Sequence, residues 1–78
     1  MVEIIEDWNA LIEHIRYCRT VVYKVDMLPE GVRLRVRAGM FGYDKVLSKK
    51  EAEEKISYLK QIGAVRIVGS IPDSIFFI

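Results

Sequence analysis

His14 and Cys18 are the residues whose types most readily carry catalytic or metal chemistry, and they stand four positions apart in a segment with helical periodicity. They are the only histidine and the only cysteine of the chain. A protein zinc site needs three or four ligands, and no second pair of such residues exists to complete one. No obvious neighbour orients a Cys–His nucleophile pair. We therefore expect no metal and no cofactor.

The acidic residues do not suggest a catalytic pair either. Glu51, Glu53 and Glu54 gather in the expected first turn of a helix, where acids stabilise the helix dipole. The segment 39–42 has a glycine at each end but lacks the glycine pattern and the lysine of a phosphate-binding loop. We therefore expect a protein that is not an enzyme.

A row of arginines is the most suggestive binding feature. Arg33, Arg35 and Arg37 alternate with apolar residues, so on a strand they share one face at a spacing of roughly 6.7 Å, twice the strand rise. Lys24 is expected beside them on the preceding strand. The row predicts a face that binds nucleic acid or an acidic partner. The alternative is a solvated face whose charge is partly balanced by Asp26 and Glu30 and contributes little.

Two further segments extend this candidate binding face. Arg66 is expected on the outer side of a strand at 64–68, and Phe76 and Phe77 lie in the apolar run 75–78. Because that run is apolar on both sides, one of the two phenylalanines is expected to point away from the helices. Aromatic residues beside arginines are typical of protein interfaces and equally of platforms that stack single-stranded bases.

The hydrophobic pattern predicts two helices among several short strands. A three-residue loop between the first two strands would pair an apolar residue with an arginine, so we expect a two- or four-residue loop, or a bulge. The second helix should begin at a capping box, Ser48 to Glu51, and end at Gly63. The expected elements are, in order, a helix over 4–18, strands over 20–27, 32–38 and 43–47, a helix over 49–62, and strands over 64–68 and 74–78.

These elements predict a single α+β domain over residues 1–78. The expected architecture is an antiparallel sheet of four to five strands with two helices on one face, in the order α-β-β-(β)-α-β-β. With no third helix available, the opposite face of the sheet must meet water or a partner.

Composition sets the expected environment. The 78 residues carry a net charge of +1, and no apolar run is long enough to span a membrane. A lone cysteine suits the reducing cytoplasm. Asparagine, glutamine and threonine each occur once, whereas charged residues make up 29% of the chain, a balance reported for thermostable proteins.

Two functions remain open on these grounds. The first is a protein-interaction module that self-associates as a homo-oligomer or binds another protein through the sheet face away from the helices. The near-neutral net charge and the acidic residues 1–15 favour it. The alternative is a nucleic-acid-binding domain that uses the arginine row, with weak and salt-dependent affinity. The basic residues 16–45, which sum to +4, favour this alternative.

Overall fold

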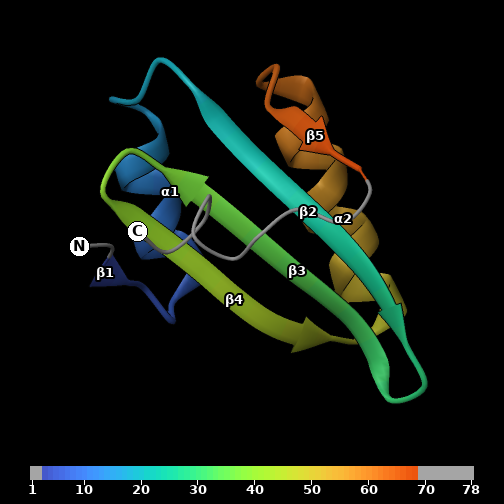
Figure 1. Cartoon of the computed structure of the whole chain (residues 1–78). Coiled ribbons are helices and arrows are strands. Elements are labelled where there is room, and N and C mark those ends of the chain that lie inside the picture. The colour runs from blue at the N-terminus through green and yellow to red at the C-terminus, as the bar shows by residue number, and fades with distance from the viewer. Residues whose placement is uncertain (1–2, 69–78) are drawn as a thin grey trace.

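The computed structural model describes residues 3–68, which form a five-stranded mixed sheet and two helices (Figure 1). The strand order across the sheet is β1-β4-β3-β2-β5. In chain order the elements are β1 (Glu3–Ile4), α1 (Trp8–Ile15), β2 (Val21–Leu28), β3 (Gly31–Ala38), β4 (Phe41–Leu47), α2 (Lys49–Gln61) and β5 (Val65–Ile67).

The strand directions explain where the helices lie. β2, β3 and β4 are antiparallel neighbours, whereas β1 runs parallel to β4 and β5 runs parallel to β2. Each helix therefore connects two parallel strands, α1 from β1 to β2 and α2 from β4 to β5, and each crosses two intervening strands in the same direction. Crossovers of one hand that step the same way place their helices on the same face. Figure 1 shows both helices behind the sheet.

The core lies between this face and the two helices. Alternate residues of the three long strands point into it, because successive side chains on a strand face opposite sides. The fully buried members include Tyr23, Leu34 and Tyr43 from the strands. Leu11 of α1 and Leu59 of α2 meet them from the helical layer, and neither is exposed to solvent.

The N-terminal segment corrects the predicted helix boundary. Asp7 has extended backbone angles, and its carboxylate accepts a hydrogen bond from the amide of Ala10 at 3.3 Å, so α1 begins only at Trp8. Upstream, the amide of Glu3 donates to the carbonyl of Met40 at 2.8 Å, which places Glu3–Ile4 on the sheet. Apolar spacing alone could not separate these residues from the helix, because a two-residue strand has no periodicity of its own.

The local turn signals are confirmed. Leu28 pairs with Gly31, so the hairpin loop has two residues and every arginine of β3 keeps its expected face. The hydroxyl of Ser48 accepts a hydrogen bond from the amide of Glu51 at 3.2 Å, which is one of the two hydrogen bonds of the predicted capping box. Gly63 has φ +80°, the left-handed conformation that ends helices.

The sheet is mixed, so the prediction of a purely antiparallel sheet and its order of elements are wrong. The α+β class and two helices are confirmed. The chirality and direction of a crossover depend on which strands pair, and the sequence pattern does not specify that. The strand predicted over 74–78 lies outside the described residues. No described helix is both long and apolar enough to cross a membrane.

Candidate functional site: the open face of the sheet

The open face is the side of the sheet opposite the two helices. Strand register and alternation assign its side chains. Within the described part of the chain, no helix or strand packs over it. Its principal side chains are Ile4, Val22, Lys24, Asp26, Arg33, Arg35, Arg37, Asp44, Val46, Val65 and Ile67.

Arg33 forms the best-defined ion pair of this face. Its Nε and one terminal nitrogen donate to the two carboxylate oxygens of Asp44 at 2.9 and 2.7 Å. This is the bidentate geometry in which a planar guanidinium matches a carboxylate. The side chains of Arg33 and Asp44 remain 38% and 26% exposed, so water screens the pair in part.

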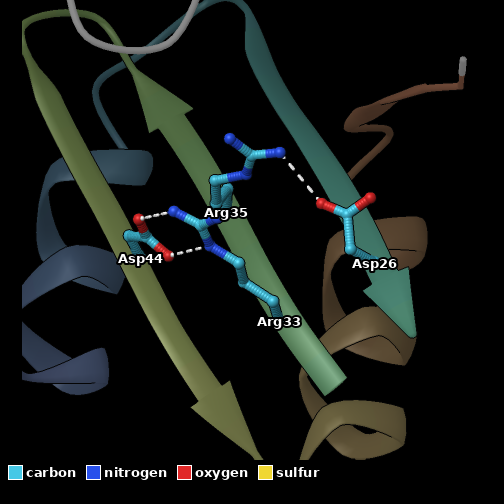
Figure 2. A network of polar contacts seen from close by, with 4 residues as sticks. All are labelled: Asp26, Arg33, Arg35 and Asp44. Carbon is cyan, nitrogen blue, oxygen red and sulfur yellow. Dashed lines mark hydrogen bonds and ion pairs between the residues drawn. The ribbon is translucent and has the colours of Figure 1, made fainter. Parts of the chain in front are cut away.

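Arg35 is paired in a different environment. One of its terminal nitrogens donates to Asp26 at 2.9 Å, and its side chain is only 6% exposed. The partners are exchanged diagonally across the strands: Asp26 lies opposite Arg33 but bonds Arg35, while Asp44 lies opposite Arg35 but bonds Arg33. Figure 2 shows the two arginines turning toward opposite neighbouring strands. The centre of the open face is therefore a compact ionic network.

Arg37 and Lys24, two further basic residues of the predicted site, lie next to this network. Arg37 lies on the same face, and its Nε donates to the carbonyl of Gly39 at 3.0 Å. Lys24 lies directly opposite Arg35 on β2 and is half-buried. The structure therefore brings together four predicted site residues, Lys24 and the three arginines of β3.

Arg66 does not join them. It pairs with Tyr23, a core residue, and so lies on the helix side of the sheet, where it is exposed at the edge. Its neighbours Val65 and Ile67 take the positions on the open face, opposite Val22 and Lys24. The predicted face was wrong because a shift of one residue in pairing reverses every side chain of a strand. Phe76 and Phe77 lie outside the described residues.

Sequence reasoning missed two parts of this face. The first is Asp44 as the partner of Arg33, together with the diagonal pairing by which Asp26, one of the acids expected to balance the charge, bonds Arg35. The second is a set of exposed apolar side chains, since Ile4, Val46 and Val65 are 47%, 49% and 56% exposed. The alternation of each strand carried part of this signal, because Asp44 and Val46 share a parity. The diagonal pairing needed the register between strands.

His14 and Cys18, the residues first considered for catalysis or metal binding, pack against other side chains of the fold. The ring of His14 stacks on Phe41, with centroids 3.7 Å apart and planes at 22°. Cys18 packs partly buried against the core as a free thiol. Among residues 3–68, no group of three or more histidine, cysteine or acidic side chains could hold a metal ion.

The chain matches no family model, and neither a curated protein nor a solved structure shows significant similarity to it.

Proposed function

We propose that this protein is a non-enzymatic interaction module that self-associates through the open face of its sheet. The observation that carries the proposal is the presence of three exposed apolar side chains, Ile4, Val46 and Val65, on the same face as the ionic network. Ile4 and Val65 stand on the two edge strands and Val46 on β4, so these side chains surround the ionic network rather than form one continuous patch.

The ionic network makes that face easier to bury than an unpaired arginine row. Removing a charge from water costs several kcal/mol unless a well-placed partner compensates it. Arg33 and Arg35 already have carboxylate partners within the same chain. A protein partner therefore need not supply counter-charges for them, and apolar contacts around the network are free to drive association.

A second copy of the chain fits the charge pattern of the face. A two-fold interface presents the same surface from both sides, so it works best when that surface carries both signs of charge. Here the basic residues Lys24 and Arg37 lie beside Asp26 and Asp44, whose side chains keep 34% and 26% of their exposure. In a two-fold dimer, the basic residues of one copy can therefore face the acidic residues of the other.

The same ion pairs weigh against nucleic acid as the partner. The four basic residues of β2 and β3 are opposed by Asp26 and Asp44, so this set of six carries a net charge of +2. Phosphate groups would have to compete with carboxylates already bound to Arg33 and Arg35. Affinity for nucleic acid depends on the number of phosphates neutralised, which this competition lowers.

Light scattering or sedimentation over a concentration series tests the proposal. The wild-type chain is expected to be a dimer or larger at high micromolar concentration. Val46→Glu should weaken association by roughly tenfold or more, because it buries a charge at an apolar contact. The new carboxylate lies opposite Arg33 in the register, so the monomer should still fold.

Met27→Glu is the matched control. Met27 is also an exposed apolar residue of a strand, but it pairs with the core residue Val32 and so belongs to the helix side. It should leave association unchanged. A strictly monomeric wild-type chain, or equal losses in the two variants, would contradict the proposal. A monomer that binds a labelled oligonucleotide at low salt would favour the nucleic-acid alternative.

A further inference from the structure

A pocket of about 380 Å³ lies where the beginnings of both helices meet β4. It is separate from the central ionic network, since none of its lining residues belongs to that network. Its volume falls within the range of small-molecule sites. It is lined by Glu6, Asp7, Trp8, Tyr43, Lys45, Leu47, Glu51 and Lys55.

Trp8 provides a fixed aromatic wall. Its ring meets Tyr43 and Tyr58 edge-on, with centroids 5.2 and 6.1 Å away, so two neighbours restrain its orientation. The ammonium nitrogen of Lys55 lies 5.5 Å from the centre of the Trp8 ring. That distance is within the range of cation–π attraction. The wall therefore already receives one ammonium group from the protein itself.

Tyr43 supplies a polar group with no partner in the described structure. The residue is only 1% exposed, and its hydroxyl makes no hydrogen bond to any residue of 3–68. Burial raises the pKa of Tyr43, and the negative charges of Glu51 and Asp7 raise it further. A phenol hydroxyl that keeps contact with solvent, as the Tyr43 hydroxyl does, is open to a partner from outside the protein. This one lies beside two carboxylates at the wall of the pocket.

The charges around the pocket define the ligand class. Three carboxylates, of Glu6, Asp7 and Glu51, and two ammonium groups, of Lys45 and Lys55, line the pocket, which leaves one negative side-chain charge in excess. Asp7 and Glu51 also lie at the helix starts, where they complement the partial positive charge of the helix dipoles. These carboxylates do not form a group that could hold a metal ion. A ligand that matches the site is therefore an organic cation, which has donors for dispersed oxygens and an apolar body for the aromatic wall.

We propose that this pocket binds a small organic ammonium ion, with its apolar part against Trp8 and its N–H groups donating to Asp7, Glu51 and the Tyr43 hydroxyl. This activity goes beyond self-association, and it requires no contribution from the open face.

Intrinsic fluorescence tests the proposal directly, because Trp8 is the only tryptophan of the chain. Butylammonium, butanol and butyrate share one apolar chain and differ in charge, so each is titrated at constant ionic strength. Butylammonium should give a saturable change, and the other two should not. An equal response to butanol, or no saturable response to butylammonium, would overturn the proposal.

Variants that keep the helix caps distinguish the effect of removing a carboxylate charge from the effect of destabilising the fold. Asp7→Asn and Glu51→Gln preserve capping chemistry, because asparagine and glutamine serve at these positions. Each should weaken butylammonium binding by about tenfold, as expected when a hydrogen bond to a charged group is lost. Glu53→Gln, on the exposed side of α2 and outside the pocket, is the matched control and should change nothing.

Lys55→Gln should act in the opposite direction. It removes the ammonium that now faces Trp8 and raises the excess negative charge to two. Butylammonium should then bind several-fold more tightly. Weaker or unchanged binding in this variant, or equal losses in Glu51→Gln and Glu53→Gln, would show that the pocket does not recognise the cation as proposed.

Discussion

The two faces of β3 are buried by different means. Leu34 points into the apolar core and is fully buried, whereas the next residue, Arg35, points to the open face and is 5% exposed. Around Leu34 lie apolar and aromatic side chains from strands and helices. Around Arg35 lies an ionic network whose hydrogen bonds depend on both the distance and the orientation of the guanidinium and carboxylate groups. Adjacent residues of one strand therefore reach similar burial through non-directional packing on one side and directional pairing on the other.

The difference shows why burial alone does not measure stabilisation. Removing apolar surface from water is favourable in nearly any well-packed arrangement. Burying an ion pair gains little over a well-packed apolar pair, because the attraction must first offset the loss of hydration. Breaking such a pair is nevertheless costly, because one charge then stays buried. We infer that the helix side supplies most of the folding free energy, while the ionic network constrains how β2, β3 and β4 align.

The largest expected effect lies on the helix side. Leu34→Ala should lower the free energy of unfolding by about 2–5 kcal/mol, the cost of lost burial and of the cavity left behind. Met27→Ala, at a largely exposed position on the same side, should change it by less than about 1 kcal/mol. Urea unfolding measures both. Similar losses in the two variants would contradict the placement of the core.

The open face should show an intermediate effect that depends on burial. Asp26→Asn removes the carboxylate that bonds the buried Arg35 and should cost about 1–3 kcal/mol. Asp44→Asn removes a bidentate partner, but Arg33 is 38% exposed, so water replaces the lost bonds and the cost should be about 0–1 kcal/mol. Urea unfolding of both variants gives the order. A larger loss for Asp44→Asn would show that geometry outweighs burial here.

Sequence patterns predicted the parts of the fold that depend on local chemistry. The Ser48 hydroxyl caps α2 because its partner, the Glu51 amide, lies within one turn. Parity limited the hairpin to a two- or four-residue loop or a bulge, and the structure has the two-residue loop between Leu28 and Gly31. The arginine row of β3 was predicted for the same reason. Asp26 was expected to balance part of its charge, but the specific ion pairs were not predicted, because Asp26 and Asp44 reach their arginines diagonally between strands. The parallel pairing of β1 and β5 was missed because it depends on contacts between distant segments.

The smallest expected effect concerns Tyr43, a core residue on the helix side that carries a polar hydroxyl group. Near pH 7, Tyr43→Phe should change the free energy of unfolding by less than about 1 kcal/mol, because the hydroxyl has no hydrogen bond within residues 3–68.

The pKa of Tyr43 is raised above 10 by burial and by Glu51 and Asp7. Above pH 10 the unfolded chain therefore loses this proton while the folded chain keeps it, so wild-type stability falls as pH rises toward the folded pKa. Urea unfolding of both proteins from pH 7 to pH 11 should show the phenylalanine variant gaining on the wild type only above about pH 10, since other titrating groups are common to both. A constant difference across this range would mean that the phenol ionises as easily in the folded chain as in the unfolded one, and that the margin of the helix side is wet rather than part of the core.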